Sequence, residues 1–407
     1  GSTCVDAGSR TAVAAGLDTY TTHKEGMVDS DIVDLGYHPK GAKNQRYADL
    51  YVTPTGSDAN SGTNWTEAFA SVTRALSVAR AGTYIHLGTG MYTTNTGEVF
   101  PLRLDTPGLR LIGTNMADTI ISAAGSLRRV ARVIDAAFCC LEGITFTRGE
   151  IPAYSEAATG GGAGFYIDHA TDLSILRCAF ISNVTYGGVN EYRQGGAIHA
   201  NVSSAIIADS LVISNKASVN AGPWSGYAYG AGMFLNGGTW VLTNTVVANN
   251  EGYGNNYGGS IGAGIYMAGG PHRLQNVLIA NNNCTVRPFG GDGIYLDGSA
   301  VFVNVTVVSN ATIAPVYAGP REGIRLAAGD ATVHNSIVWG NDDDLYGFPT
   351  NELGQLTNVS YTCIEDGDNV GVFGCVTNEP MFVDGVYFHL QAQNGYYTNS
   401  YFDGTVL

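Results

Sequence analysis

A seven-residue phrase that returns along the middle of the chain constrains its fold more than any other feature. Each copy is rich in apolar and β-branched residues, and all but the first close on Asn. The copies of this first phrase are EGITFTR (142–148), RCAFISN (177–183), DSLVISN (209–215), NTVVANN (244–250), NVLIANN (276–282), NVTVVSN (304–310) and NSIVWGN (335–341). A period of about 30 residues fits short strands joined by turns and is too short for a strand–helix–strand unit. The repeat therefore predicts a right-handed parallel β-helix, an all-β solenoid in which each coil buries its neighbours.

A second phrase is interleaved with the first. Its copies are AGFYID (163–168), GAIHAN (196–201), AGMFLN (231–236), AGIYMA (263–268), DGIYLD (292–297) and EGIRLA (322–327). The leg from this phrase to the next closing Asn has a nearly constant length, whereas the return leg varies. A constant leg indicates regular strand pairing, and a variable leg indicates surface loops.

The closing asparagines predict a ladder inside the solenoid. A turn Asn at the same place in each coil can form hydrogen bonds with the Asn above and below it. Each such bond contributes about 1 kcal/mol net. The predicted ladder consists of Asn183, Asn215, Asn250, Asn282, Asn310 and Asn341.

Composition narrows the range of partners. The chain has 407 residues, of which 14% are charged, and its formal net charge is −15. A nucleic-acid partner is therefore not expected, because binding a duplex requires a positive field. The same sign disfavours polyanionic sugars unless arginines cluster locally. No apolar run is long enough to span a bilayer.

Two stretches resemble a known group of proteins. LYVTPTGSDANSGTNWTEAFASVTRALSVARAGTYIHLGTGMYT (50–93) and CVTNEPMFVDGVYFHLQ (375–391) are similar to segments of secreted bacterial right-handed β-helix proteins of the pectin-lyase-like type. The resemblance implies an opening strand and a capping helix within 47–93, and β-helix coils over 94–407 with the final coils from about 355. The helix is expected from about Thr66 to Ala81, with an inner face of Phe69, Val72, Leu76 and Val78. The resemblance points to a fold and not to one activity, since this fold hosts lyases, hydrolases, adhesins and fibres.

The chain ends look permuted against this group. In proteins of this group, the closing FHLQ segment is usually followed by two further phrases. This chain carries similar phrases at its start instead, as STCVDAGSR and VDLGYHPKG. Residues 1–46 therefore resemble the C-terminal end of a preceding β-helix module. Three explanations stay open: one period of a tandem array, separate chains joined head to tail into filaments, or a longer parent cut at these points.

The second phrase also predicts a surface stripe, because strand side chains alternate between two sides. If its apolar positions (Phe165, Ile198, Met233, Ile265, Ile294 and Ile324) face inward, the outward stripe is Tyr166, His199, Phe234, Tyr266, Tyr295 and Arg325. Such a stripe can stack on sugar rings, or it can be cross-strand packing beneath loops. The loops beside it are rich in Tyr, Trp, Gly and Asn, which suits glycan or protein contact or packing of the loops on themselves. The candidate ligand-binding residues are Tyr166, His199, Tyr266, Tyr295, Arg325, Trp224, Tyr227 and Tyr257.

Catalytic residues are harder to identify. A lyase would need a base and a cation to neutralise an acidic sugar, and His199 with Arg193 and Tyr192 is the candidate trio. A hydrolase would need paired carboxylates. Asp168, Glu191 and Asp292 fall near the loop side, but nothing in their spacing brings two of them together.

Metal and disulfide signals are weak. Carboxylates gather in turns at 342–344 and 365–368, as calcium sites require, but neither stretch is a complete calcium loop, and solvated turn acids are the alternative. No cofactor or catalytic metal is predicted; structural calcium is the one alternative. Cys363 and Cys375 are close enough in sequence to close a small disulfide loop.

The uniform phrases leave no obvious break for a catalytic cleft. This favours a structural or adhesive module of a large bacterial fibre, extracellular or at the cell surface, joined head to tail with like modules. The alternatives are a carbohydrate-active enzyme, first a polysaccharide lyase and then a glycoside hydrolase, or a glycan-binding module without chemistry. The expected partners are copies of the chain or adjacent modules, and glycans, with no nucleic acid and no membrane span.

Overall fold

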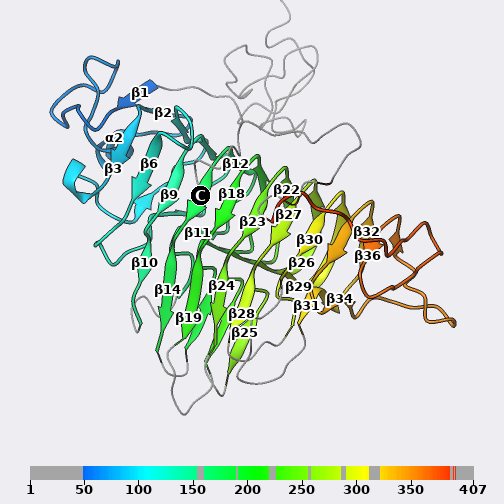
Figure 1. Ribbon diagram of the computed structural model, residues 1–407. Helices are drawn as coiled ribbons and strands as arrows, with labels where there is room; N and C mark the ends of the chain where they lie inside the picture. The colour runs from blue at the N-terminus through cyan, green and yellow to red at the C-terminus, as the bar shows by residue number, and fades with distance from the viewer. Residues whose placement is uncertain are drawn as a thin grey trace, which may run out of the picture.

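The computed structural model describes residues 49–390 apart from 154–159, 189–190, 220–225, 255–257, 286–289, 311–320, 386–387 and 389. This part of the chain is a parallel β-solenoid, as predicted (Figure 1). Short strands stack coil upon coil along one axis, from the blue N-terminal coils to the orange C-terminal ones. Residues 1–46, which resemble the end of a preceding module, lie outside the described residues, as do Trp224 and Tyr257.

Each coil passes through up to five faces, which we number in chain order. The first face consists of β4 (Leu102–Arg103), β7 (Ala131–Ile134), β11 (Phe165–Asp168), β16 (Ile198–Asn201), β21 (Met233–Asn236), the first halves of β26 (Ile265–Gln275) and β29 (Ile294–Val303), β31 (Glu322–Ala328) and β34 (Asp343–Tyr346). The second face consists of β1 (Asp49–Val52), β2 (Tyr84–Leu87), β5 (Arg110–Gly113), β8 (Cys140–Glu142), β12 (Leu173–Leu176), β17 (Ala205–Ala208), β22 (Trp240–Thr243), the second halves of β26 and β29, β32 (Ala331–His334) and β35 (Val359–Ser360). These two faces form one sheet, because β26 and β29 run through both.

The other three faces are separate sheets. The third face consists of β3 (Gly90–Tyr92), β6 (Thr119–Ser122), β9 (Thr145–Thr147), β13 (Ala179–Ile181), β18 (Leu211–Ile213), β23 (Val246–Ala248), β27 (Leu278–Ala280), β30 (Thr306–Val308), β33 (Ile337–Trp339) and β36 (Cys363–Ile364). The fourth face consists of β10 (Glu150–Ile151), β14 (Val184–Gly187), β19 (Lys216–Val219), β24 (Glu251–Tyr253) and β28 (Asn283–Thr285). The fifth face consists of β15 (Tyr192–Gln194), β20 (Tyr227–Tyr229) and β25 (Gly259–Ile261).

Both sequence phrases correspond to strands. The first phrase supplies the third face and the second phrase supplies the first face. The apolar positions expected to face inward are successive register partners, and each is fully buried: Phe165, Ile198, Met233, Ile265, Ile294 and Ile324. The predicted alternation of the second phrase is therefore confirmed, and the side chains that follow these residues point outward.

The six asparagines form a continuous ladder inside the solenoid. At each step the Nδ2 and backbone N–H of one Asn both donate to the Oδ1 of the next, at 3.0 Å and 3.0 Å from Asn183 to Asn215. The last step, from Asn310 to Asn341, has the same pattern at 3.2 Å and 3.0 Å. Each Nδ2 in the interior of the ladder also donates to a backbone carbonyl of the preceding coil, as Asn250 does to Val212 at 3.0 Å. All six amides are buried, so the ladder supplies partners to polar groups that water does not reach.

The first copy of the first phrase is shifted by one residue. Thr147 pairs with Ile181, so Arg148 aligns with Ser182 and Gly149 aligns with Asn183. Arg148 and Ser182 share a left-handed backbone, with φ of 56° and 55°. The ladder therefore begins where Gly149 N–H donates to Asn183 Oδ1 at 2.9 Å, and Arg148 is a turn residue outside it.

A second, shorter-range pattern marks the turn before the third face. Ser210 Oγ donates to the Ala208 carbonyl at 2.7 Å and accepts from the Cys178 N–H at 3.1 Å. Ser336 Oγ repeats this with the His334 carbonyl and the Val305 N–H, at 2.9 Å and 3.1 Å. These buried hydroxyls satisfy backbone groups at a corner that the sheets leave unpaired.

The capping helix is shorter than expected. α2 covers Val72–Val78, and a 3₁₀ turn, η2 (Thr94–Thr96), comes after β3. Its N-terminus is fixed by two distant carboxylates: Asp58 accepts from the Ser71 N–H, and Glu98 accepts from the Val72 and Thr73 N–H groups. Phe69 is buried ahead of the helix, and Val78, expected on the inner face, is exposed. No helix in the described ranges is long and apolar enough to cross a membrane.

Cys363 and Cys375 do not form the predicted disulfide, because both are free thiols. Cys363 is the register partner of Val376, so Cys375 points to the opposite side of the chain. Cys375 is buried in the core, whereas Cys363 Sγ donates to the Asn378 carbonyl at 3.2 Å near the surface.

Candidate functional site

The outward side chains of the first face form one continuous aromatic column, which we call the stripe. Tyr166, His199, Phe234, Tyr266 and Tyr295 are successive register partners. Their ring centres are separated in turn by 5.2, 5.1, 4.8 and 5.3 Å. The last two pairs are nearly parallel, with interplanar angles of 18° and 7°.

Exposure changes along the stripe. Tyr166, His199 and Phe234 are buried, whereas Tyr266 and Tyr295 are half-buried. In the coils of Tyr166, His199 and Phe234 the stripe is therefore cross-strand packing, which is one of the two alternatives that the sequence left open. In the next two coils the phenol rings reach the surface.

Tyrosines of the fifth face extend the exposed part of the stripe. Tyr192 and Tyr227 are stacked with ring centres 5.8 Å apart, and Tyr229 meets the edge of Tyr266 at 5.6 Å. The corner between the two faces is tight because Gly195 has a left-handed φ of 61°, and any β-carbon there would meet the Ile198 carbonyl. Strands of different faces thus bring together one surface, the tyrosine platform: Tyr192, Tyr227, Tyr229, Tyr266 and Tyr295.

Arg325 closes the C-terminal end of the stripe. Its guanidinium carbon lies 6.0 Å from the ring centre of Tyr295 and 4.5 Å from that of Tyr346. One of its nitrogens also donates to Glu322 at 2.8 Å. Glu322 is fully buried, and burial raises the pKa of its carboxyl group. Tyr346 was not predicted as part of the stripe, because it lies outside both repeated phrases. In its coil the return leg after Asn341 is much shorter than in the earlier coils.

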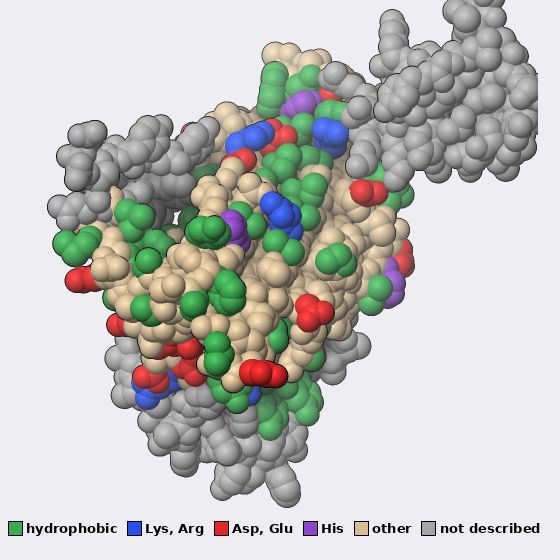
Figure 2. Space-filling model, turned by 90° about the vertical axis from the view of Figure 1, so that its right-hand side faces the viewer, with side chains coloured by type: hydrophobic (Ala, Val, Ile, Leu, Met, Phe, Trp, Pro, Cys, Tyr) green, Lys and Arg blue, Asp and Glu red, His purple; other side chains and the backbone are tan. Residues whose placement is uncertain are grey.

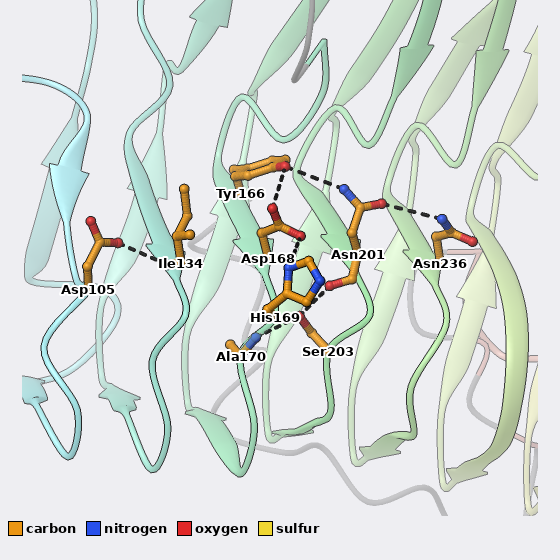
Figure 3. Close-up of polar contacts among 9 residues, drawn as sticks. All are labelled: Asp105, Ile134, Tyr166, Asp168, His169, Ala170, Asn201, Ser203 and Asn236. Atoms are coloured by element: carbon orange, nitrogen blue, oxygen red, sulfur yellow. Dashed lines mark hydrogen bonds and ion pairs between the residues drawn. The ribbon is translucent and has the colours of Figure 1, made fainter.

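A polar row runs beside the stripe, two residues further along each strand (Figure 3). Tyr166 Oη donates to Asp168 Oδ2 at 3.3 Å, and Asn201 Nδ2 donates to Tyr166 Oη at 3.4 Å. Asn236 Nδ2 continues the row to Asn201 Oδ1 at 3.4 Å. Asp168 Oδ1 pairs with His169 Nδ1 at 3.0 Å. Carboxylate and amide groups therefore line one side of the stripe in the coils of Tyr166, His199 and Phe234.

The polar row also has a signal in the sequence. The second phrase ends on Asp168, Asn201, Asn236 and Asp297 in four of its six copies. These residues are on the same outward side as the stripe, because they follow it at a spacing of two. Asp168 alone was considered, as a candidate hydrolase carboxylate.

His199 is enclosed in the middle of the stripe. Burial lowers the pKa of its imidazole to about 4, against small opposing contributions from Asn201 and the Gln194 carbonyl. Neither ring nitrogen has a hydrogen-bond partner of good geometry. Its ring packs between Tyr166 and Phe234, so this histidine is a neutral packing element at pH 7.

The other two members of the predicted catalytic trio have partners other than His199. Arg193 is buried, and its guanidinium donates to the Tyr186 carbonyl at 2.7 Å, to the Gly160 carbonyl at 3.2 Å and to Glu191 at 2.7 Å. Tyr192 points the other way and is exposed. Arg193 thus fastens the fifth face to its neighbours, while Tyr192 belongs to the platform.

The candidate carboxylates have three different surroundings. Asp168 is in the polar row, Glu191 holds Arg193, and Asp292 is fully buried. At the C-terminal end, the acids at 342–344 and 365–368 bind backbone amides, as when Asp344 Oδ2 accepts from the Glu365 N–H at 2.7 Å. Within the described ranges, no group of three or more His, Cys, Asp or Glu side chains is arranged to hold a metal ion.

Comparison with known proteins adds one family match. Residues 54–126 match a family described as a protein of unknown function (DUF1565), which is less than half of the chain. No curated protein matches.

Eighteen chains of solved structures match. They include the pectate lyase Pel9A, with a TM-score of 0.46, 12% identity, and coverage of 87% of this chain and 93% of that chain. A rhamnogalacturonan lyase has a TM-score of 0.43 and 14% identity over 83% of this chain and 91% of that chain. A pectin methylesterase from Aspergillus niger has a TM-score of 0.37 and 11% identity over 77% of this chain and 89% of that chain. The activities in these names are those of the other proteins.

Proposed function

We propose that this chain is a non-catalytic module that binds a neutral polysaccharide along the tyrosine platform. The observation that carries the proposal is the gathering of five tyrosine rings, each at least partly exposed, from two faces of the solenoid. Aromatic faces stack on the C–H faces of sugar rings. The coils repeat every ~4.8 Å along the axis, so the surface suits an extended chain rather than one compact molecule.

The polar row supplies the other half of sugar recognition. Asp168, Asn201 and Asn236 carry oxygen acceptors and amide donors along the edge of the stripe. Sugar hydroxyls can exchange hydrogen bonds with both kinds of group. Aromatic rings with a few polar groups on one side can thus orient a sugar chain.

Charge favours a neutral ligand over a uronate polymer. The net charge of the chain is −15, and Asp297 lies close enough to Tyr266 and Tyr295 for its charge to act on both phenols. Burial raises the pKa of Tyr266 to about 12, and the negative charge of Asp297 adds to that shift. A polymer of carboxylates would be repelled by the same charges.

Binding without chemistry fits the surroundings of the candidate catalytic groups. His199 is buried between two rings, and the guanidinium of Arg193 donates to two carbonyls and to Glu191. A general base must come within hydrogen-bond reach of a substrate proton, which buried groups of this kind do not do.

Affinity electrophoresis tests the proposal. The purified chain is run through native gels containing xyloglucan, glucomannan, arabinoxylan, mixed-linkage β-glucan or polygalacturonate. We expect at least one neutral polysaccharide to retard the protein and polygalacturonate not to. Tyr192→Ala and Tyr227→Ala should each weaken retardation about 5- to 10-fold, the loss of one aromatic contact. Tyr186→Ala is the matched control, an exposed tyrosine on the fourth face.

Three results would count against the proposal. Retardation by polygalacturonate alone would contradict the neutral ligand. Equal retardation of Tyr192→Ala and the parent would move binding away from the platform. Release of new reducing ends or unsaturated products would identify the chain as an enzyme.

We also propose that this binding serves adhesion outside the cell or at its surface, in an array of like units joined head to tail. The uninterrupted Asn ladder supports a stiff rod-like unit. Figure 2 looks onto the C-terminal end and shows hydrophobic side chains scattered among other side chains and backbone. The intact mass of the polypeptide in its source separates a covalent array, many times 42.6 kDa, from a single unit.

A further inference from the structure

A second aromatic and polar cluster lies at the opposite end of the solenoid from Arg325. On β1 and β2, Tyr51 stacks on His86 with ring centres 5.1 Å apart, and Trp65 meets the edge of Tyr51 at 4.9 Å. His86 Nε2 lies 3.0 Å from Asp49 Oδ1, and both side chains are about a quarter exposed. We call these four residues the Trp65 cluster.

Strand alternation explains why the cluster faces outward. β1 buries Leu50 and Val52, so Asp49 and Tyr51 point away from the core. Tyr51 is the register partner of His86, which places the two rings one above the other.

A rigid loop holds Trp65 against these strands. The Tyr51 N–H donates to the Gly62 carbonyl at 2.8 Å, and the Phe69 N–H donates back to the Tyr51 carbonyl at 2.9 Å. Between them, Asn64 Oδ1 accepts from the Thr66 and Glu67 N–H groups, both at 3.0 Å. The loop is thus strapped to β1 on both sides of the indole, so Trp65 is positioned before any ligand arrives.

Exposure separates Trp65 from the tryptophans that serve packing. Its side chain is 53% exposed, whereas Trp240 is fully buried and Trp339 is half-buried. A tryptophan that only filled the core would be covered, because removing an indole from water is strongly favourable. This indole instead stands on a fixed loop beside an ion pair that can exchange hydrogen bonds.

We propose that the Trp65 cluster is a second sugar-binding site, which takes a neutral sugar residue against the indole and hydrogen-bonds its hydroxyls to Asp49 and His86. The inference rests on the proposed function, since the ligand is the same neutral polysaccharide. The cluster lies on the second face at β1 and β2, whereas the tyrosine platform lies on later coils of the first and fifth faces. A sugar chain long enough to reach both sites would bind with a higher apparent affinity, because binding at the first site raises the effective concentration at the second.

Trp65 fluorescence provides a direct test. The full chain is titrated with cellohexaose, xylohexaose, mannohexaose and laminarihexaose, and hexagalacturonate serves as the charged probe. We expect one neutral hexaose to protect the exposed indole from acrylamide quenching and hexagalacturonate to have no effect. For this titration every chain carries Trp224→Phe, because Trp224 is itself a candidate ligand-binding residue close in sequence to Tyr227 of the platform. In that background Trp65→Phe should lose the protection, because Trp240 and Trp339 do not belong to the cluster. Asp49→Asn should weaken the protection at a given hexaose concentration.

The polysaccharide gels supply the second readout. Trp65→Ala should weaken retardation about 5- to 10-fold, and the double variant with Tyr192→Ala should abolish it. Val99→Ala is the matched control, an apolar residue near the same end that is 67% exposed. Both substituted residues are mostly exposed, so neither change removes core packing.

The outcomes separate this inference from the proposed function. Retardation that depends on Tyr192 but is unchanged in Trp65→Ala, or quenching protection that persists in Trp65→Phe, overturns the second site alone. No retardation of the parent chain by any neutral polysaccharide overturns the proposed function and this inference with it.

Discussion

At the scale of single residues, the ladder asparagines do more than fill a turn. Asn250 accepts both donors of Asn215 at 3.0 Å, and it donates to the Val212 carbonyl and to Asn282 Oδ1. Removing this amide leaves several buried groups without partners, and each such group costs about 1–3 kcal/mol.

We therefore expect Asn250→Ala to lower the free energy of unfolding by about 3 kcal/mol or more. Asn236→Ala, at an exposed amide with a single long hydrogen bond, should change it by less than about 0.5 kcal/mol. Urea denaturation of both variants measures the difference. Similar losses in the two variants would show that the ladder is not the stabilising element.

His199 gives a pH prediction at the same scale. Burial lowers its pKa to about 4 in the folded chain, against 6.5 for the unperturbed group. Between these values the unfolded chain binds the proton and the folded chain does not, so stability falls as the pH falls from about 6.5 to 4, by up to about 3 kcal/mol. His199→Phe keeps an aromatic ring between Tyr166 and Phe234 and should lack this loss. A stability difference between variant and parent that does not change with pH would contradict the assignment.

At the scale of elements, the C-terminal end of the ladder depends on Asp344. Its Oδ1 accepts from Asn341 Nδ2 at 3.0 Å, in the place that the next asparagine would occupy. Burial raises the pKa of Asp344 to about 7, and the nearby acids Asp366 and Glu365 add to the shift. Because the folded pKa is above the unfolded one, this group contributes stability at low pH that is lost as the pH rises from about 4 through about 7.

Hydrogen exchange can detect this end effect. Between pH 6 and 8, the opening free energies of amides in β33, β34 and β36 should fall by about 1 kcal/mol relative to those in β13 and β18. Asp344→Asn should remove this pH dependence whatever its effect on stability at one pH. Parallel behaviour of the two groups of strands in the parent chain would count against the role of Asp344.

The elements also show what the sequence could and could not predict. The repeated phrases identified the solenoid, the inward residues and the ladder, because a coil repeats the same backbone environment at one position. The predicted bounds of the helix were wrong, because Asp58 and Glu98, which are remote in sequence, fix where α2 begins. The prediction of a disulfide between Cys363 and Cys375 was wrong, because a shift of one residue in strand register places the two cysteines on opposite sides of the chain. The sequence could not predict the burial of His199 and Arg193, because that burial depends on how the faces fold over one another.

At the scale of the whole molecule, the charge balance should be visible in stability. Besides Asp344, burial raises the pKa of Glu98, Glu322, Asp343 and Asp368. All these shifts oppose ionisation in a chain that already carries −15.

Salt should therefore stabilise the chain more at high pH than at low pH. At 0.1 M ionic strength the screening length is about 10 Å, which weakens repulsion among surface acids. We expect 0.5 M NaCl to raise the Tm by about 3 °C more at pH 8 than at pH 5.5. Calorimetry at the two pH values gives the answer, and a larger shift at pH 5.5 would contradict this account of the charges.

The central claim is that a neutral polysaccharide lies on the tyrosine platform. Hydrogen–deuterium exchange, with and without the neutral polysaccharide that retards the chain most, tests this directly. The account predicts slower exchange in Tyr192–Gln194 of β15, in Tyr227–Tyr229 of β20 and in the first half of β26, with no change in the fourth-face strand β14. Protection confined to the fourth face or to the C-terminal end, with β15, β20 and β26 unchanged, would contradict it.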